Sequence, residues 1–264
     1  LITVNKPINE AILNQYKNAK AVLVAFTGYG IHDLDLCKER NISVYNVPDY
    51  SSSSVAELAI GLTLAVLREI PKGENVLRNG GWAFSPGGND LRGKTVGIVG
   101  TGTIGICTAK LFNAFGCKLI GWSRSERQEF KDLGGIYVSR EELFSTADIV
   151  SLHIPNNKET RKCIGENDFQ LLKPTSILIN TARGQVCDQD ALVKYLVNGK
   201  FRAGLDVYAI EPLPEDDGGL RKCDNVVITP HVAYKTKEAL TRRAAITANN
   251  AINALNGDDT NRVG

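Results

Sequence analysis

Short apolar runs rich in valine and isoleucine recur along the chain, and most are separated by stretches with the spacing of an amphipathic helix. Runs that are apolar at nearly every position are typical of parallel strands whose sheet is covered by helices on both faces. The pattern therefore predicts an α/β protein. The runs are AVLVA (21–25), ISVYN (42–46), TVGIV (95–99), CKLIGW (117–122), DIVSLH (148–153), SILIN (176–180), RAGLD (202–206) and NVVIT (225–229).

The stretch VAELAIGLTLAVLREI (55–70) is predicted to be a helix. Ser54 and Glu57 have the spacing of a capping box, so we expect the helix to begin there, with Glu57 mainly a cap, and to end near Pro71. The helix is apolar on most sides. This predicts burial between domains or against another subunit, and hence a homodimer.

Three segments are expected from the change in composition along the chain. Residues 79–93 are rich in Gly, Asn and Pro and lack periodicity, which indicates a hinge or crossover with a domain boundary near Leu91. We therefore predict one domain over 1–91 and a doubly wound domain over 92–233. A segment over 234–264 would carry a long helix that packs back on the first domain.

A glycine-rich turn lies directly between the predicted strand 95–99 and the helix that follows it. Gly100 permits a tight turn, Gly102 lets backbone approach a pyrophosphate, and Gly105 allows close contact between helix and strand. With Thr103 and Ile104, these residues open a helix whose unpaired N–H groups favour phosphate. The turn predicts dinucleotide binding, although such glycines also occur in turns that bind nothing.

The residues after the strand 117–122 bear on the choice of cofactor. An acid commonly stands there and accepts hydrogen bonds from the adenosine ribose, but this chain has Ser123 and Arg124. A small side chain and a positive charge suit a 2′-phosphate, so NADP is favoured slightly over NAD. The alternative is that Arg124 is a solvated loop residue.

Composition narrows the possible partners. The formal net charge is +2 with both signs interspersed, which disfavours nucleic-acid binding. The six cysteines lack paired spacing, so we expect free thiols rather than disulfides or a metal site. No apolar run is long enough to span a membrane, and we expect a soluble, cytoplasmic protein.

Arg183, Glu211 and His231 follow predicted strands and suit reduction of a carbonyl group. His231 has the side chain that donates protons most readily near neutral pH, and His153 also ends a strand. Arg183 has a rigid fork that suits a carboxylate, and Glu211 is placed to orient an imidazole. Each residue has an ordinary structural alternative: a loop ion pair, a solvated turn or a capped strand end.

Motifs over most of the chain point to a known family. They are TGYGIHDLDL (27–36), NVPDYSSSSVAELAIGLTLAVLR (46–68), GKTVGIVGTGTIG (93–105), HIP (153–155), NTARG (180–184), LDVYAIEPLP (205–214), TPHVA (229–233), TKEA (236–239) and NRV (261–263). In these motifs the chain resembles the D-isomer-specific 2-hydroxyacid dehydrogenases, and in the last two it resembles most their glycerate dehydrogenase and hydroxypyruvate reductase branch. The resemblance implies a Rossmann-type dinucleotide domain and a flavodoxin-like substrate domain. Family members usually carry a further strand, helix and strand before Leu1, so we expect the substrate domain to be incomplete at its N-terminus.

The resemblance also implies a role for each candidate residue. Arg183 would bind the carboxylate and carbonyl of the substrate, His231 would exchange the proton, and Glu211 would pair with His231. Backbone at Tyr29 and Gly30 would hold the substrate carboxylate. The residues expected beside the cofactor are His153, Pro155, Thr181 and Asp206.

The leading hypothesis is an enzyme that reduces hydroxypyruvate or glyoxylate with NAD(P)H. Oxidation of phosphoglycerate, phosphite or formate is an alternative within the same class of enzymes. A dinucleotide-gated binding protein, like the corepressors built on this fold, is an alternative from another class.

Overall fold

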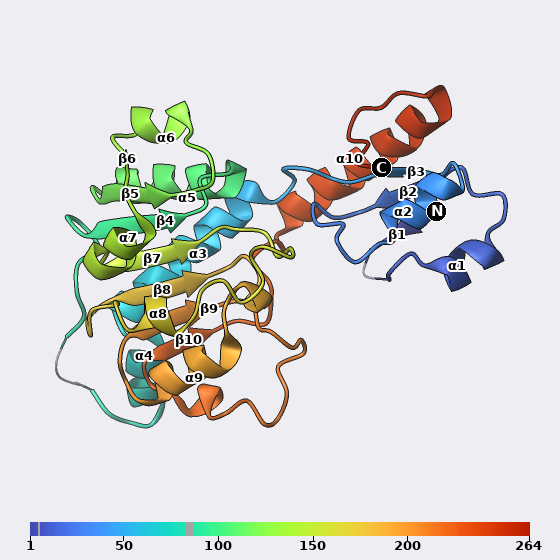
Figure 1. Ribbon diagram of the computed structural model, residues 1–264. Helices are drawn as coiled ribbons and strands as arrows, with labels where there is room; N and C mark the ends of the chain where they lie inside the picture. Colours follow the sequence, from blue (N-terminus) through green and yellow to red (C-terminus); the bar gives the residue numbers. More distant parts are fainter. Residues whose placement is uncertain (5, 83–86) are drawn as a thin grey trace. The chain divides into compact units, whose positions relative to one another are not determined.

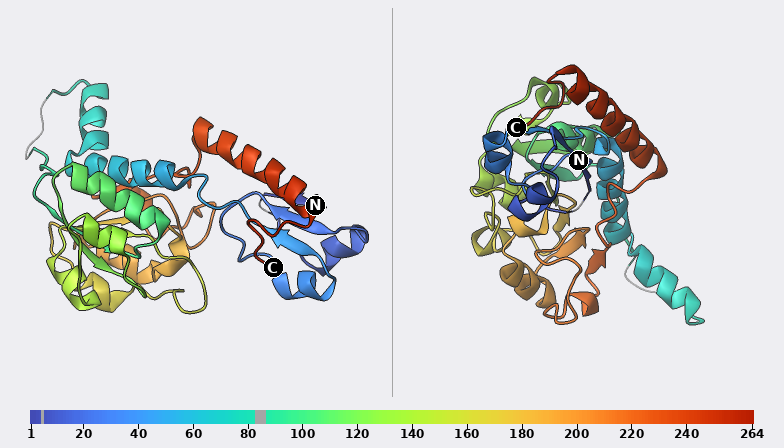
Figure 2. Two further views of the ribbon diagram at one scale, coloured as in Figure 1. Left: turned by 90° about the horizontal axis from the view of Figure 1, so that it is seen from above. Right: turned by 90° about the vertical axis from the view of Figure 1, so that its right-hand side faces the viewer.

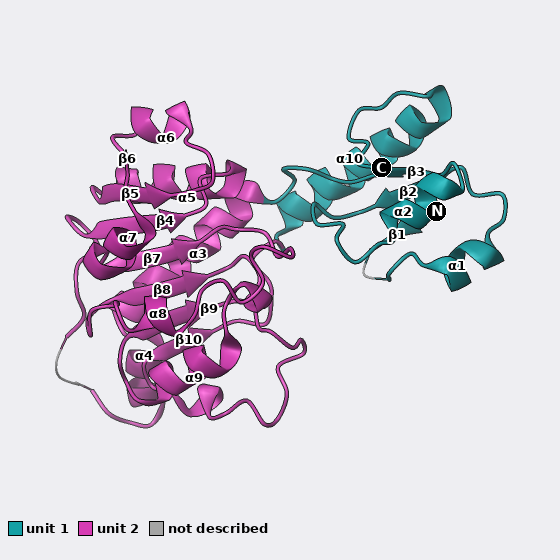
Figure 3. Cartoon of the chain, viewed as in Figure 1, with its two compact units in different colours: residues 1–51, 235–264 teal, residues 52–234 magenta. Residues whose placement is uncertain are grey.

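The computed structural model describes residues 1–4, 6–82 and 87–264 of the chain. It divides the chain into two compact units, which Figure 3 shows in different colours. Unit 1 comprises residues 1–51 and 235–264, and unit 2 comprises residues 52–234. Each unit contains a parallel sheet, so the α/β fold predicted from the apolar runs is confirmed.

Unit 2 is built on a seven-stranded parallel sheet with the strand order β10-β9-β8-β7-β4-β5-β6 (Figure 1). The chain proceeds from β4 outward through β5 and β6, and then returns to the other side of β4 at β7. Ligands of doubly wound sheets bind at such a switch point, beyond the carboxyl ends of the strands. The strands are β4 (Thr95–Val99), β5 (Lys118–Trp122), β6 (Ile136–Tyr137), β7 (Ile149–Leu152), β8 (Ile177–Asn180), β9 (Arg202–Leu205) and β10 (Val226–Ile228).

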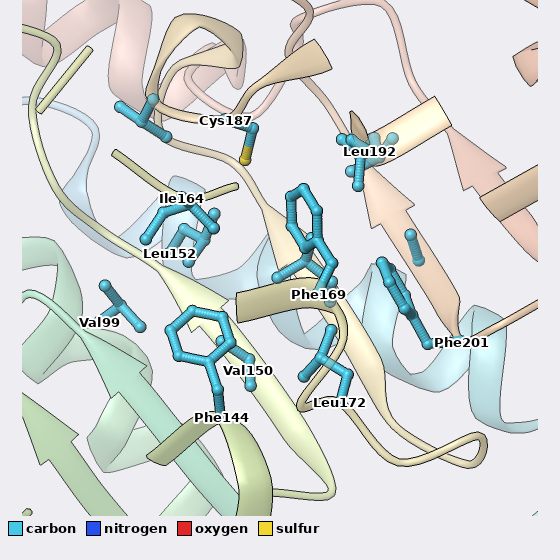
Figure 4. Packing of buried hydrophobic residues seen from close by; sticks show 14 of the residues in the cluster. Val99, Phe144, Val150, Leu152, Ile164, Phe169, Leu172, Cys187, Leu192 and Phe201 are labelled. Atoms are coloured by element: carbon cyan, nitrogen blue, oxygen red, sulfur yellow. The ribbon is translucent and has the colours of Figure 1, made fainter. Parts of the chain in front are cut away.

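Helices cover both faces of this sheet and close two apolar cores. Helices α3 and α5 lie side by side over the core that contains Ile98 and Phe112 (Figure 2). Figure 4 shows the second core, where Phe144, Phe169 and Phe201 pack together. The helices of unit 2 are α3 (Ser52–Leu67), α4 (Ile70–Arg78), α5 (Thr103–Ala114), α6 (Gln128–Asp132), α7 (Arg140–Thr146), α8 (Glu166–Phe169) and α9 (Gln189–Val197), with 3-10 turns at Gly184–Val186 and Leu220–Lys222.

Helix α3 begins and ends earlier than its sequence pattern predicts. Ser54 lies inside the helix rather than before it, and Glu57 is exposed, so the expected capping box does not form at the helix start. The helix ends before Glu69, whose φ of 52° is left-handed. Pro71 lies in the first turn of α4, where its missing N–H removes no helical hydrogen bond.

The apolar surface of α3 is buried on the sheet of unit 2. The helix packs against α5, β8 and β9, and a Cβ on Gly204 would lie 2.9 Å from the Cβ of Leu62. The division between the units consequently falls between Ser51 and Ser52 rather than near Leu91. Because these contacts within unit 2 bury α3, the homodimer inferred from this helix stays a prediction.

The segment 79–93 was expected to cross between domains, but its described part stays within unit 2. Residues 83–86 of this segment lie outside the described residues. After them, the N–H of Asn89 donates to the carbonyl of Leu67 at 2.9 Å, and Leu91 is buried. The chain therefore runs past the end of α3 before it enters β4.

Unit 1 contains a three-stranded parallel sheet in the order β1-β2-β3. Val22, Val24 and Val44 form its core with residues of the adjoining helices. Helix α10 packs against β2 (Figure 2), and the end of the chain pairs with β3 through Val44 and Val263. The elements are β1 (Ile2–Thr3), α1 (Glu10–Gln15), β2 (Ala21–Val24), α2 (Leu34–Glu39), β3 (Ser43–Tyr45) and α10 (Lys237–Asn256).

Three further observations concern the cysteines, membrane spans and metal ions. All six cysteines are free thiols, and Cys37, Cys117 and Cys187 are buried. The described part of the chain has no helix long and apolar enough to cross a membrane. In the same residues, no three His, Cys, Asp or Glu side chains gather in a way that would hold a metal ion.

Candidate active site

The glycine turn is crowded in two places and open in a third. Gly100 has a left-handed φ of 94°, and a Cβ there would lie 2.8 Å from the carbonyl oxygen of His153. A Cβ on Gly105 would come within 2.1 Å of the carbonyl oxygen of Gly100, whereas a Cβ on Gly102 would meet nothing within 4 Å. The turn therefore packs tightly against the protein but leaves open space at Gly102, the N-cap of α5, which continues with Thr103 and Ile104.

Within the described residues, two buried polar atoms without a hydrogen-bond partner lie after β7 and β8, the strands that follow β4 in the order of the sheet. They are Nδ1 of His153, which follows β7, and Oγ1 of Thr181, which follows β8. Unpaired buried polar groups are costly, so these atoms fit a ligand that supplies their partners. Together with the open space at Gly102, they make this edge of the sheet suitable for a dinucleotide.

His153 cannot serve as the proton donor of this site. Its Nε2 lies 2.8 Å from Oγ of Ser151, and burial lowers the pKa of the imidazole to about 3. The ring consequently stays neutral near neutral pH. Pro155, which follows it, is exposed and accepts a hydrogen bond from Thr160 through its carbonyl.

The loop after β5 is held by a tyrosine that the sequence patterns did not single out. The hydroxyl of Tyr137 lies 2.7 Å from Oγ1 of Thr101 and accepts from the N–H of Arg127 at 2.8 Å. This links the glycine turn to the loop that contains Ser123 and Arg124. Arg124 is 91% exposed and 4.0 Å from the nearest carboxylate oxygen, that of Glu159, so its charge is left available to a ligand.

His231 and Glu211 form a close pair. Nδ1 of His231 lies 2.6 Å from Oε2 of Glu211, and each side chain is about one-third exposed. The other oxygen of Glu211 accepts from the N–H of Tyr208 at 3.0 Å. Burial opposes ionisation of Glu211, but these hydrogen bonds and the charge of Arg183 outweigh it and lower the pKa of the carboxyl group.

Arg183 lies in a loop whose backbone is held by side-chain hydrogen bonds, whereas the guanidinium bonds only to a neighbouring carbonyl among the described residues. Asn180, the last residue of β8, accepts from the N–H of Ala182 at 3.0 Å and donates to the carbonyl of Arg183 at 3.1 Å. The guanidinium of Arg183 donates to the carbonyl of Ala182 at 2.6 Å and, within the described residues, makes no ion pair. Asn180 belongs to the motif NTARG, but its residue type alone did not reveal this function.

The loop that contains Arg183 packs against the loop that leads to Glu211. A Cβ on Gly184 would lie 1.9 Å from the carbonyl carbon of Tyr208, so a side chain there would collide with the neighbouring loop. Gln185 also donates to the carbonyl of Ala209 at 3.0 Å. Arg183, Glu211 and His231, which the sequence pointed to separately, therefore lie on adjoining loops at the carboxyl edge of the sheet.

Asp206, the acid expected beside the cofactor, is bonded to the turn that follows β10. Its buried carboxylate accepts hydrogen bonds from Thr229, Val232 and Ala233, all in the turn that contains His231. Thr229 is a further residue that the sequence analysis did not select.

Tyr29 and Gly30 lie in unit 1, in the loop between β2 and α2. The loop is closed by a hydrogen bond from the N–H of His32 to the carbonyl of Tyr29, at 3.0 Å. It is tied to the segment before α1 because the N–H of Ile8 donates to Nδ1 of His32 at 3.1 Å. The loop is thus ordered by contacts within its own unit.

Comparison with known proteins supports a single family. Residues 60–233 match the family model described as D-isomer specific 2-hydroxyacid dehydrogenase, NAD binding domain. The chain is 38% identical over 265 residues to the glyoxylate reductase of Thermococcus litoralis, with 97% of this chain and 80% of that protein covered. The hydroxypyruvate reductase of Thermotoga maritima is 40% identical over 237 residues, with coverages of 88% and 76%.

A solved structure shows the same fold. The D-lactate dehydrogenase of Aquifex aeolicus, complexed with NAD and lactic acid, matches with a TM-score of 0.91 at 31% identity. The match covers 99% of this chain and 86% of that one. With the family match over the Rossmann-type unit, this confirms the resemblance seen in the sequence motifs, and the chain belongs to the D-isomer-specific 2-hydroxyacid dehydrogenases.

Proposed function

We propose that this protein reduces a small 2-keto acid, hydroxypyruvate or glyoxylate, to the 2-hydroxy acid with NADPH or NADH. The observation that carries the proposal is the 2.6 Å contact between His231 and Glu211, because it sets an imidazole in place to exchange a proton. The loop of Arg183 lies against the loop that leads to Glu211, so a cation for the substrate belongs to the same site. The glyoxylate and hydroxypyruvate reductases among the relatives support the same substrate class.

When bound, the nicotinamide supplies the hydride that adds to the carbonyl carbon. Glu211 occupies Nδ1 of His231, which leaves Nε2 as the nitrogen that donates a proton to the carbonyl oxygen. The carboxylate of Glu211 also fixes the plane of the ring. One hydride and one proton together convert the keto group to a hydroxyl group.

Arg183 binds the carboxylate of the substrate and polarises its carbonyl group in this proposal. Its planar fork suits two parallel hydrogen bonds to an acid, and its exposed guanidinium makes no ion pair within the described residues.

The side chains after β5 support a preference for NADPH over NADH. Ser123 leaves room for a 2′-phosphate, and the exposed Arg124 supplies a positive charge. Arg124→Ala should raise KM for NADPH about 10-fold and leave KM for NADH unchanged. Equal changes with both cofactors would show that Arg124 is a solvated loop residue.

The test of the function is turnover of the purified chain. NADPH and NADH oxidation would be followed with hydroxypyruvate, glyoxylate and pyruvate in parallel, for the wild type and for Arg183→Ala. Loss of the bidentate contact should lower kcat/KM at least about 100-fold. Arg78→Ala, which removes an exposed arginine of α4, is the matched control.

Two results would overturn the proposal. An Arg183→Ala variant with unchanged kinetics would remove Arg183 from the site. Tight cofactor binding without turnover of any of these keto acids would favour a dinucleotide-gated binding protein instead.

A further inference from the structure

Asp206, just after β9, is completely buried. One turn of the chain supplies the hydrogen-bond donors to its carboxylate. Its Oδ1 accepts from the hydroxyl of Thr229 at 2.6 Å and from the N–H of Val232 at 2.9 Å. Its Oδ2 accepts from the N–H of Ala233 at 2.9 Å. Donors from the turn 229–233 therefore converge on a single carboxylate.

His231 lies in the middle of this turn in an uncommon backbone conformation. Its φ is 54°, in the left-handed region, which costs free energy for any residue with a Cβ and persists where the surroundings determine it. The backbone of Asp206 contributes as well, because its carbonyl accepts from the N–H of His231 at 2.8 Å. Asp206 thus holds the turn before, at and after the histidine.

The direction of the imidazole depends on this turn. Glu211 is fixed from its own side by the N–H of Tyr208, and His231 must present Nδ1 to it within 2.6 Å. A change in the backbone angles at His231 would swing the ring away from Glu211. The contact between them therefore requires the turn to keep its left-handed residue.

We propose that Asp206 is a positioning residue for proton transfer, which acts by clamping the turn 229–233 so that His231 meets Glu211. Its effect on proton transfer is exerted through the position of His231. This inference rests on the proposed function for its effect on turnover. The geometry that it explains lies within unit 2 and is measurable without a substrate.

The first test of the clamp changes Thr229 and leaves the charge of Asp206 in place. Thr229→Val removes the hydroxyl that donates to Oδ1, and Thr229→Ser keeps a hydroxyl at the same position. The clamp predicts that Thr229→Val lowers kcat about 10-fold and that Thr229→Ser restores most of it. Equal kcat for wild type and Thr229→Val would overturn the proposal.

Asp206→Asn distinguishes a clamp from a cofactor ligand. The amide nitrogen of Asn would face the N–H of Ala233, a donor against a donor, so the turn should loosen. A clamp predicts a fall in kcat of at least about 10-fold, measured beside the Kd of NADPH and NADH by fluorescence titration. A weakened Kd with unchanged kcat would identify a cofactor contact and overturn the proposal.

A spectroscopic measurement separates the clamp from the proposed function. The imidazole N–H of His231 in its hydrogen bond to Glu211 should give a downfield proton resonance, which His231→Asn identifies among the three histidines. The resonance should weaken in Thr229→Val and return in Thr229→Ser, whether or not the protein reduces a keto acid. Its persistence in Thr229→Val would overturn the clamp, whereas inactivity of the wild type would overturn only the function.

Discussion

His231 and Arg183, which both lie at the carboxyl edge of the seven-stranded sheet, differ in how many of their hydrogen bonds the protein supplies. His231 has its backbone N–H bonded to Asp206 and its Nδ1 bonded to Glu211. The backbone of Arg183 is held equally well by Asn180, but its guanidinium donates to the carbonyl of Ala182, a neutral acceptor in its own loop. The proposed acid is therefore positioned before substrate binds, whereas the proposed substrate-binding cation has no carboxylate partner within the described residues.

The difference matches what each group has to do in the proposed reaction. Proton transfer requires a fixed distance and direction, and a ring set in place before binding loses no free energy to reorientation in the transition state. Binding of a carboxylate requires an unsatisfied charge, which an existing ion pair would reduce. We therefore expect changes at His231 to affect mainly kcat and changes at Arg183 to affect mainly KM.

The largest expected effect is that of removing the acid. His231→Asn keeps a polar side chain of similar reach but cannot carry a proton near neutral pH, so kcat should fall about 1,000-fold. KM for the keto acid should change little. Steady-state kinetics on hydroxypyruvate and glyoxylate checks this, and a large rise in KM with unchanged kcat would contradict the division of roles.

Arg183→Lys should give the second largest effect, and the opposite split. Lysine keeps the charge but loses the planar fork, so KM for the keto acid should rise about 100-fold while kcat falls less. Because Asn180 bonds to the backbone, the loop itself should be unchanged. Equal losses in kcat for this variant and for His231→Asn would remove the contrast between the two groups.

Much of the fold could be predicted from residue patterns, because strands buried on both faces are apolar at nearly every position. Every apolar run contains a strand of the structure, whereas the two-residue strands β1 and β6 are too short to produce a pattern. The unit boundary was misplaced for a different reason. The apolar surface of α3 shows that the helix is buried but does not show which sheet buries it.

The site could be predicted as a set of residues but not as a set of contacts. Arg183, Glu211 and His231 follow strands and have side chains suited to the chemistry, so their positions pointed to one edge of the sheet. The function of Asp206 could not be read in the same way, because two of its three partners are backbone N–H groups more than twenty residues away. Backbone donors have no signature in a sequence.

His153 is a second histidine at the end of a strand, and its ring stays neutral in the folded state near neutral pH. Burial lowers its pKa to about 3, whereas an unfolded histidine titrates near 6.5. Below that value the unfolded chain binds the extra proton, so stability should fall as the pH decreases towards 3. Between about pH 7 and about pH 5, His153 should lower the free energy of unfolding by about 2 kcal/mol.

Urea unfolding of the wild type and His153→Asn at the two pH values measures this contribution. The variant should lose less stability on acidification than the wild type, whatever its stability at neutral pH. His32, whose pKa is also lowered by burial, remains in both proteins and serves as an internal control. An equal loss in the two proteins would mean that His153 titrates normally.

Glu211→Gln should have the smallest effect and should test why the acid is held in advance. The amide oxygen of Gln can still accept from Nδ1 of His231, so orientation is kept and the charge is lost, which should lower kcat about 10-fold.

The contact between Glu211 and His231 also predicts how kcat of the wild type depends on pH. Because the pKa of Glu211 lies below its ordinary value of 4.5, the carboxylate and its effect are present above that value and are lost as the pH falls through the lowered pKa. Wild-type kcat should therefore decline on the acid side only below about pH 4.5, and Glu211→Gln, which has no carboxylate to protonate, should lack that decline. A decline shared by both proteins would assign it to another group and leave the ring of His231 fixed by geometry alone.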